Sequence, residues 1–345
     1  MAKRVRISDD AGSNWYTLPG NSAELSSEAG EIDDTTFGQD FSSTQTGLIG
    51  WTLSANALFK GFAGYSAKIL KVGTSTTLTD EAMSVVSGKT YQITDSAKRV
   101  LNRAVAVTVE DNSVTVSAAN IESIDYLFGR ITFVSSYTPT TPITISGAYY
   151  PMATVGCANT FSLTQTANAN DVTCPSEAQS NSGHRVFDYG LKNVSVELSG
   201  IYNASNAFRA LLAARTEIIL EINPDGNGKT VARGFFKPTK TGQSGDVGDL
   251  ESESITFNLS VPDNDAIPYP FHWLIATDST INTAIKKALE SWEASALIDI
   301  AYLPDGTTGV KGDAVITDLT LTGGLEVMNE FTVNVQGSGA LSAYP

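Results

Sequence analysis

Hydrophobic and polar residues alternate along most of this chain, with the period of two that half-buried β-strands require. Residues 254–261 (SITFNLSV) set Ile, Phe, Leu and Val against Thr, Asn and Ser. Residues 330–336 (EFTVNVQ) repeat the pattern, with Phe and Val against Glu, Thr, Asn and Gln. The pattern predicts strands that bury one face and leave a polar face outside.

Two segments instead carry the period of an amphipathic helix. Residues 206–215 (NAFRALLAAR) follow the capping-type residues Asn203 and Ser205 and gather Phe and Leu on one side. Residues 280–295 (TINTAIKKALESWEAS) gather Ile, Ala, Leu and Trp in the same way. The chain is therefore predicted to be mainly β (α+β), with two helices.

The order helix, strand, turn, strand, strand occurs twice, which indicates an internal repeat. The first helix leads into EIILEINPDG (217–226) and the second into LIDIAYLPDG (297–306). The two Pro-Asp-Gly turns lie 304 − 224 = 80 residues apart, and each copy closes on a Thr-x-Asn strand. Superposition is expected to place Gly226 on Gly306 and Asn258 on Asn334.

The front of the chain repeats as well. Residues 47–58 (GLIGWTLSANAL) match residues 190–201 (GLKNVSVELSGI), and each follows a polar stretch. The first front is not followed by a helix, so the strands between the two fronts are interpreted as an insertion. The predicted division is 1–64 as the front of unit A, 65–152 as an inserted β-rich module, 153–262 as unit B, and 263–345 as the back of a discontinuous unit A.

The amino-acid composition argues against several classes of function. The 37 acidic residues outnumber the 22 basic ones, and the net charge of −15 argues against non-specific DNA binding as the main activity. Two His and two Cys leave little material for a metal site. No window approaches the ~18 apolar residues of a membrane helix and no targeting signal is present. Cys157 and Cys174 are therefore expected to be reduced thiols of a cytoplasmic fold.

Motifs that could carry chemistry are better explained as structure. The segment GKT (228–230) lacks the first glycine of a phosphate-binding loop and is interpreted as a hairpin turn. His184 and His272 have no partner at ligand spacing. Glu251 and Glu253 are interpreted as solvated acids at the start of a strand. The expectation is a protein that is not an enzyme and holds no cofactor or metal.

The order of elements over residues 155–262 resembles the tail tube (major tail) proteins of long-tailed, non-contractile bacteriophages. The similar run is GLKNVSVELSG, the helix NAFRALLAAR, the strand TEIILEI, the PDG turn, KTVARGFFKPTKTG and the strand ESESITFNLSVP. The repeat extends the resemblance to 17–62 and 263–345, whereas 65–152 has no counterpart. It implies one tail-tube-type β-sandwich with a flanking helix per unit, and rings of six units stacked into a hollow tube that conducts DNA.

The resemblance also implies partners and a location. Because this chain carries two units, three chains per pseudo-hexameric ring are favoured, with a hexamer as the alternative. Tape measure, tail tip and terminator proteins would be neighbours in the virion tail, assembled in the cytoplasm of the host bacterium, with no membrane involved. The alternative reading is a β-rich phage or bacterial surface adhesin. A carbohydrate-active enzyme would need two carboxylates facing one cleft, which no segment indicates.

Two sets of residues are candidates for function. A conduit must not hold DNA, so the polar strand faces are expected to line the lumen, unless they simply face bulk water. The polar stretches 31–46 and 169–189 are expected to be mobile in an isolated subunit and to order between rings. The lumen candidates are Thr256, Asn258, Ser260, Glu330, Thr332, Asn334 and Gln336. The inter-ring candidates are Asp33, Asp34, Asp40, Asp171, Glu177 and His184.

Overall fold

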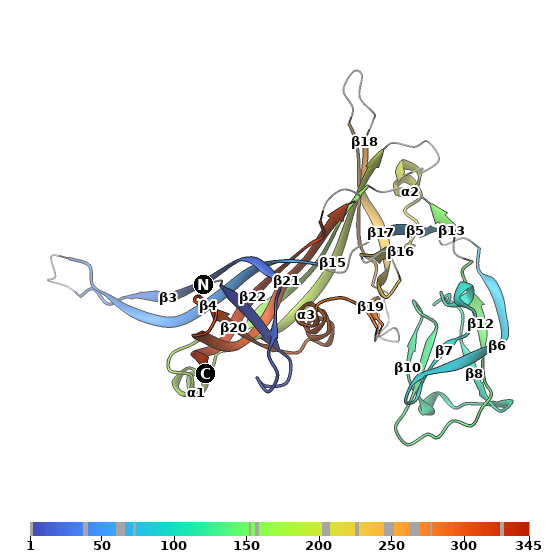
Figure 1. Ribbon diagram of the computed structural model, residues 1–345, viewed down its shortest axis with the longest axis horizontal. Helices are drawn as coiled ribbons and strands as arrows, with labels where there is room; N and C mark the ends of the chain where they lie inside the picture. Colours follow the sequence, from blue (N-terminus) through green and yellow to red (C-terminus); the bar gives the residue numbers. More distant parts are fainter. Residues whose placement is uncertain are drawn as a thin grey trace.

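Strands dominate the computed structural model, which confirms the prediction of a mainly β fold (Figure 1). The strands form one fifteen-stranded and one seven-stranded antiparallel sheet. The structure describes residues 3–36, 41–59, 66–71, 74–151, 153–155, 159–201, 208–224, 228–244, 252–261, 270–276, 278–324 and 328–344.

Both predicted helices are present. They are α2 (Phe208–Ala214) and α3 (Thr283–Ala294). The Asn282 side chain accepts a hydrogen bond from the main chain of Ala284 and so caps α3, and Ser295 ends the helix in the left-handed region with φ of 55°. A further helix, α1 (Pro175–Ser180), lies inside the stretch 169–189, which the sequence predicted to be a polar loop.

The large sheet is built from two similar groups of strands. Its central part runs in the order β3, β4, β22, β21, β14, β15, β18, β17. Unit A supplies β1 (Arg4–Ser8), β2 (Tyr16–Thr17), β3 (Gly20–Asp33), β4 (Thr44–Leu58), β20 (Ile298–Leu303), β21 (Gly309–Gly324) and β22 (Glu330–Tyr344). Unit B supplies β14 (Thr160–Asp171), β15 (Phe187–Ile201), β16 (Ile218–Asn223), β17 (Thr230–Ser244) and β18 (Ser252–Leu259). Strand β19 (Phe271–Ile275) lies in the segment 263–345 that the sequence assigned to unit A, but it pairs with β17 of unit B. The pairing of β4 with β22 is what a discontinuous unit A requires, and the division itself stays a prediction.

The two groups share the positions of their bulges. In β17 the bulge residue Thr239 donates its hydroxyl hydrogen to the carbonyl oxygen of Thr256, 3.2 Å away. In β21 the bulge residue Thr317 donates in the same way to the carbonyl oxygen of Asn334, at 3.1 Å. Thr256 therefore corresponds to Asn334, at an offset of 334 − 256 = 78 residues.

This register corrects one prediction from the sequence. Asn258 corresponds to Gln336 and not to Asn334, because the repeated Thr-x-Asn letters are displaced by two residues from the bulges that fix the register. Gly226, the other residue expected to superpose, lies outside the described residues. The front hairpins agree as well: β15 bulges just before Lys192, the partner of Ala167, and β4 bulges just before Ile49, the partner of Ala29.

The inner face of the large sheet carries the main core. Buried side chains from both units, including Leu53, Leu163, Phe257 and Val333, belong to one continuous cluster with the apolar face of α3. The hydrophobic effect acting on this shared face holds unit A and unit B together, in addition to the strand pairing between β21 and β14.

The seven-stranded sheet forms a separate lobe (Figure 1). It comprises β6 (Thr76–Ser87), β7 (Thr90–Ile93), β8 (Thr108–Asp111), β9 (Val114–Thr115), β10 (Ile121–Asp125), β11 (Arg130–Phe133) and β12 (Ile143–Tyr149). The strands that lead into and out of it, β5 (Ser66–Lys71) and β13 (Ala153–Val155), pair with each other, and β5 also pairs with β16 in the large sheet. Leu127 and Phe128 of the lobe pack on Ile219 and Phe235, so the inserted module rests on unit B.

Candidate functional site

The outer face of the large sheet is polar across both units. One row of directly opposed residues crosses eight strands, and its side chains are joined by hydrogen bonds at several steps. Thr332 donates to Asn56 Oδ1 at 2.9 Å, and Asn56 donates to Ser22 Oγ at 3.1 Å. The row reads Lys237, Asn258, Ser195, Thr164, Thr320, Thr332, Asn56 and Ser22. This surface, with the two flanking rows, is called the polar face below.

Two further rows run beside the first. One contains Thr256, Glu197, Ser162, Thr322 and Glu330, and the other contains Asn193, Thr166, Asp318, Asn334, Ser54 and Glu24. Alternate residues of the same strands point inward and are buried. The polar face is therefore one side of a sheet whose other side is the core, as the alternation in the sequence predicted.

The structure brings six of the seven lumen candidates to this face. Thr256, Asn258, Glu330, Thr332 and Asn334 lie in the three rows, and Gln336, directly opposite Thr52, lies beside them on the same side of the sheet. Ser260 is the exception, because β18 ends at Leu259. Ser260 is 6% exposed and donates to Glu217 Oε2 at 2.7 Å, so it cannot belong to the polar face. Whether the face lines a lumen stays a prediction.

The charge on the polar face is mostly acidic. Glu24, Glu197, Glu330 and Asp318 lie in the three rows, and burial raises the pKa of Asp318 above its usual value. Two cations lie at the β17 end of these rows, Lys237 directly opposite Asn258 and Lys240 directly opposite Thr256. The alternation in residues 254–261 and 330–336 did not include these lysines; their position in the strand that precedes β18 could have indicated them.

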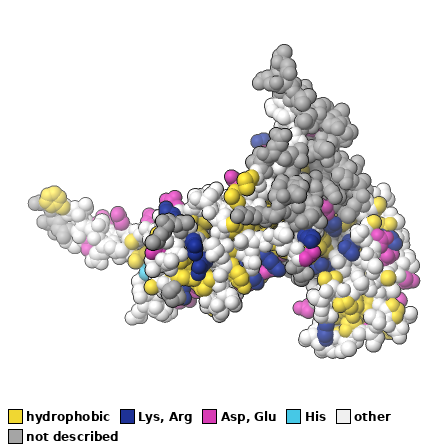
Figure 2. Space-filling model, viewed as in Figure 1, with side chains coloured by type: hydrophobic (Ala, Val, Ile, Leu, Met, Phe, Trp, Pro, Cys, Tyr) yellow, Lys and Arg dark blue, Asp and Glu magenta, His cyan; other side chains and the backbone are white. Residues whose placement is uncertain are grey.

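The β3–β4 hairpin leaves the sheet as a long arm (Figure 1). Residues 20–58 contain no Lys or Arg, and acidic side chains are visible along the arm in Figure 2. The stretch 31–46, predicted to be a loop, is strand up to Asp33 and again from Thr44, so the connection is shorter than expected. Leu25, Trp51 and Leu53 at the base of the hairpin belong to or pack on the main core, but residues 26–31 and 44–47 carry no apolar side chain larger than alanine. The apolar alternation that identifies a strand is therefore missing from the outer part of the arm.

The first inter-ring candidates lie at the tip of the arm. Asp33 accepts a hydrogen bond from the main chain of Thr35 at 2.9 Å, and hydrogen bonds from Thr35 lower the pKa of Asp33. Asp34 accepts from Gln45 at 2.8 Å, and contacts with Ser43 and Gln45 lower its pKa. Asp40 lies outside the described residues.

The second set lies at the base of the arm. Asp171 pairs with Arg185 at 3.3 Å, and Glu177 accepts from the main chain of Cys174 at 3.2 Å in the capping box of α1. The Nδ1 atom of His184 is 2.9 Å from the carbonyl oxygen of Asn181. The structure therefore does not bring the two sets together: one lies at the far end of the arm and the other beside its root.

The stretch around α1 is attached to unit A. The main chain of Ile49 donates to the carbonyl oxygen of Gly183 at 2.8 Å, and Arg185 donates to that of Ile49 at 2.9 Å. Gly339 donates to the carbonyl oxygen of Arg185 at 2.7 Å. These bonds anchor a segment that its composition marked as a free loop, and the sequence carries no signal for them.

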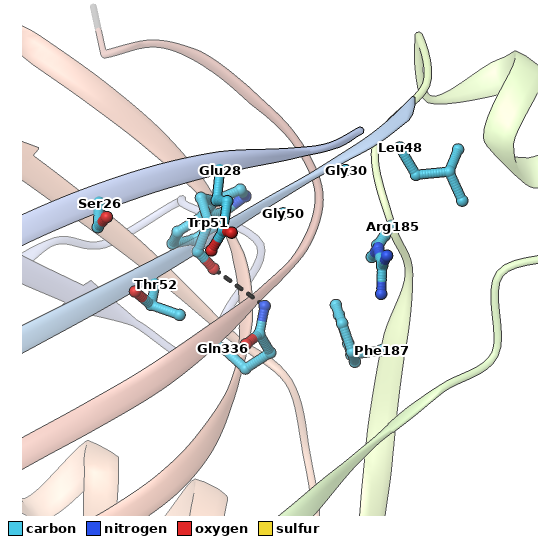
Figure 3. A pocket seen from close by; sticks show the side chains of 10 residues that line it. All are labelled: Ser26, Glu28, Gly30, Leu48, Gly50, Trp51, Thr52, Arg185, Phe187 and Gln336. Carbon is cyan, nitrogen blue, oxygen red and sulfur yellow. Dashed lines mark hydrogen bonds between the residues drawn. The ribbon is translucent and has the colours of Figure 1, made fainter. Parts of the chain in front are cut away.

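A hollow of about 290 Å³ lies where the arm leaves the sheet (Figure 3). Glu28, Thr52, Arg185 and Gln336 line it, and Gln336 donates to the carbonyl oxygen of Trp51 at 3.1 Å. Its open, polar lining continues the polar face toward the arm. The hollow has no pair of carboxylates held at the separation that glycoside hydrolysis needs, since Glu28 is the only acid among its lining residues.

The remaining candidates have structural roles. Gly228 lies in the turn between β16 and β17, and Glu253 is 3% exposed, so the prediction of a solvated acid was wrong for Glu253, whose pKa burial raises. Glu251 and Cys157 lie outside the described residues, and Cys174 is a free thiol. His272 lies 2.5 Å from Glu293 Oε1. Within the described residues, no three His, Cys, Asp or Glu side chains are grouped as metal ligands.

Comparison with known proteins gives little beyond this geometry. No protein family and no curated protein matches the chain. Among solved structures, it is similar to a chain described as "Tail of empty GTA particle computed with helical refinement, C6 symmetry", with 15% identity and a TM-score of 0.29 over 32% of this chain and 84% of that chain. This is a weak likeness to one chain of a tail particle, and no residue role is taken from it. None of the described helices is long and apolar enough to span a membrane.

Proposed function

We propose that this chain is a structural protein of a phage tail, whose copies close into rings that stack as a tube for DNA. The observation that carries the proposal is the polar face, which runs without a break across two equivalent units of one sheet. A wall of this kind is suited to surround a polyanion without binding it, because each Lys or Arg that pairs with a phosphate adds affinity. Hydroxyl, amide and carboxylate groups dominate this face.

The arrangement of the strands supports a ring. The eight central strands begin with β3 and end with β17, so the two ends of the row differ and can meet only head to tail. A head-to-tail contact produces a closed ring when the rotation per subunit divides the circle. Two units per chain then favour three chains for a ring of six units, and six chains remain the alternative.

The partners follow from this role. Other copies of the chain form the tube, tape measure, tail tip and terminator proteins border it, and viral DNA passes through without specific binding. The chain performs no catalysis and takes no cofactor, and it resides in the virion tail after assembly in the host cytoplasm. The alternative is a surface adhesin. Such a protein would have the same acidic, β-rich composition but would form discrete particles and not rings.

Electron microscopy of the purified chain tests the proposal. Negatively stained particles are expected to appear as rings with an open centre and as stacks of such rings. A preparation of discrete particles, at every protein concentration and salt tested, would favour the adhesin and contradict the tail-tube proposal. A variant with Gly-Ser in place of residues 76–149 is a useful companion, because the inserted module lies outside the central strands and its loss should leave the rings in place.

A further inference from the structure

The chain contains one complete joint between two units. Strand β21 of unit A pairs with β14 of unit B, with Asp318 opposite Thr166 and Thr322 opposite Ser162. Thr320 and Thr164 face each other in the middle, and their hydroxyl oxygens are 3.3 Å apart. This joint shows how the end of one unit receives the beginning of the next.

The equivalent end of unit B has an open edge. Phe236 of β17 pairs with Ile218 of β16 and with Leu259 of β18, so β16 and β18 lie on opposite sides of β17. Beyond Phe236, the β16 side of β17 has no strand partner within the described residues. In unit A the same side of β21 is the one that β14 occupies.

The beginning of unit A is open as well. Strand β3, which corresponds to β14, pairs with β4 alone in the described part of the chain. Its outward residues Glu24, Ser26 and Glu28 are exposed, and Leu25 packs partly on the core. Unpaired edges of this kind recruit another strand.

We infer that a second copy of this chain lays its β3 along the open edge of β17, in the register that β14 and β21 use within one chain. That this contact closes a ring rests on the proposed function. The register of the contact follows from the internal repeat alone. Bulge-matched positions give an offset of 78 for β17 and 138 (167 − 29) for β3. The pairs that follow are Lys240 with Glu28, Thr241 with Ser27, Gly242 with Ser26, Gln243 with Leu25, and Ser244 with Glu24 of the second copy.

Charge supports this register. Both described lysines of β17, Lys237 and Lys240, lie at or beside the open edge and are exposed, and β3 carries Glu24, Glu28 and Glu31 without any basic residue. The register places Lys240 directly opposite Glu28. Opposite charges at directly opposed positions stabilise an antiparallel pair, whereas like charges destabilise it. In the joint within the chain the same positions hold Asp318 and Thr166.

A groove beside the open edge supports it independently. The groove lies between α2 and β17 and is lined by Leu212, Ala213, Pro238 and neighbouring residues. In the joint within the chain, the corresponding place is filled by β15: Lys192 donates to the carbonyl oxygen of Trp292 at 2.7 Å, and the main chain of Ile316 donates to Tyr189 Oη at 3.0 Å.

The groove beside β17 and the corresponding place beside β21 differ in residues that would be in contact with each other. Pro238 corresponds to Ile316 and has no N–H to donate. The residue of the second copy that corresponds to Tyr189 is Thr46, which has no phenol oxygen to accept such a bond. Lys192, which donates to the carbonyl oxygen of Trp292 at the end of α3, corresponds to Ile49. The apolar side chain of Ile49 suits Leu212, which lines the groove. The main-chain donor of Ile316 and the phenol acceptor of Tyr189 therefore both lack a counterpart, as expected if the groove receives β4 of a second copy.

Cross-linking tests the register. In a background with Cys157 and Cys174 replaced by serine, Glu24→Cys and Ser244→Cys are made as separate variants, mixed and oxidised. The mixture should yield a covalent dimer, while either variant alone should not. A Ser26→Cys variant mixed with Ser244→Cys is the out-of-register control, because diagonal Cβ atoms lie about 7–8 Å apart and a disulfide needs about 4 Å. The pair Ser162→Cys with Thr322→Cys in one chain is the positive control.

Charge exchange provides the second measurement. Lys240→Glu or Glu28→Lys alone should weaken self-association several-fold, because a pair of like charges then replaces the pair of opposite charges at every joint. The two changes in one chain should restore it. Equal cross-linking in the in-register and out-of-register mixtures, or no rescue by the double exchange, would overturn the inference.

The outcomes separate this inference from the proposed function. Rings without in-register cross-links would leave the tail-tube proposal standing and reject this joint. In-register cross-links in a protein that never forms rings or tubes would keep the joint and reject the tube. Absence of both would reject both.

Discussion

Gly337 allows Trp51 to pack against β22. A Cβ atom at Gly337 would lie 1.9 Å from Trp51 Cε2, and the indole Nε1 donates to the carbonyl oxygen of Gly339 at 3.0 Å. Trp51 is 2% exposed and belongs to the main core. Trp51 therefore fixes the place where the β3–β4 hairpin joins the back of unit A.

Gly337→Ala should destabilise the protein because the added methyl group overlaps the indole ring. Overpacking of this kind costs about 1–3 kcal/mol or more. Gly50→Ala is the matched control, since its new Cβ atom would meet only Gln336 Nε2, at 4.0 Å. Denaturant unfolding of both variants measures the difference. Equal stability of the two would contradict the packing described for Trp51.

Asp299 gives a pH-dependent prediction. Burial, with the facing carboxyl of Asp313, raises the pKa of Asp299 from 3.8 to about 6, while Lys311 and the main chain of Gly12 act in the opposite direction. A raised pKa means that the folded state keeps a proton that the unfolded state has released, so stability falls as pH rises between these values. Asp299→Asn should therefore gain stability relative to the wild type as pH rises from about 4 to 7. A difference that does not change with pH would contradict this assignment.

At the scale of elements, the arm is the most distinctive feature. Its tip carries Phe41, whose side chain is 86% exposed, together with the exposed acid Asp33. These residues contribute nothing to the core of a single chain. We expect them to contact the next ring, where ordering them costs entropy that new contacts must offset.

Replacement of residues 34–43 by Asn-Gly should leave a folded, soluble protein that forms rings but does not stack them. The change keeps the pairing of Asp33 with Thr44, so β3 and β4 can still close as a hairpin. Phe41→Ser is the milder companion variant, with an expected reduction in tube length. Sedimentation and electron microscopy measure the length of the assemblies. Tubes of normal length after the replacement would show that the tip has no role in stacking.

The sequence predicted the elements better than their register. Alternation identified β18 and β22, and helical periodicity identified α2 and α3, because each buries one apolar face. The offset between Asn258 and Asn334 was wrong because a bulge leaves no mark in residue type. Ser260 was placed on the polar face because the alternation continues after the strand has ended at Leu259. The outer part of the arm was predicted to be a loop because residues 26–31 and 44–47 present no apolar face.

On the scale of the whole molecule, the polar face unites residues far apart in sequence. The row from Asn258 to Ser22 is assembled by strand order, which alternation alone cannot give. The inserted module contacts this assembly from the side, through Leu127 and Phe128 and through Arg233, which pairs with Glu221 at 2.7 Å and donates to the carbonyl oxygen of Leu127 at 2.9 Å. Its sheet lies outside the central order of strands, which is consistent with a role other than closing the ring.

Asn258→Lys combined with Asn334→Lys should leave assembly intact while slowing DNA ejection from particles that carry the variant chain. Each added cation pairs weakly with phosphate, but the contacts repeat in every ring and their sum grows along the tube. The defect should ease as salt rises. Val85→Lys with Val114→Lys adds the same charge to exposed positions of the inserted module and should eject normally. Normal ejection at low salt by the Asn258 and Asn334 variant would reject the lumen assignment.

The central claim is that copies of this chain surround a channel with the polar face turned inward, and a cryo-electron microscopy reconstruction of the assembled protein tests it most directly. The account predicts stacked rings of six similar units, three chains in each, with Asn258, Thr332 and Asn334 on the channel wall and the cluster that contains Phe257 and Val333 behind them. A reconstruction with the polar face on the outer surface of the tube would contradict the claim. So would discrete particles without a channel.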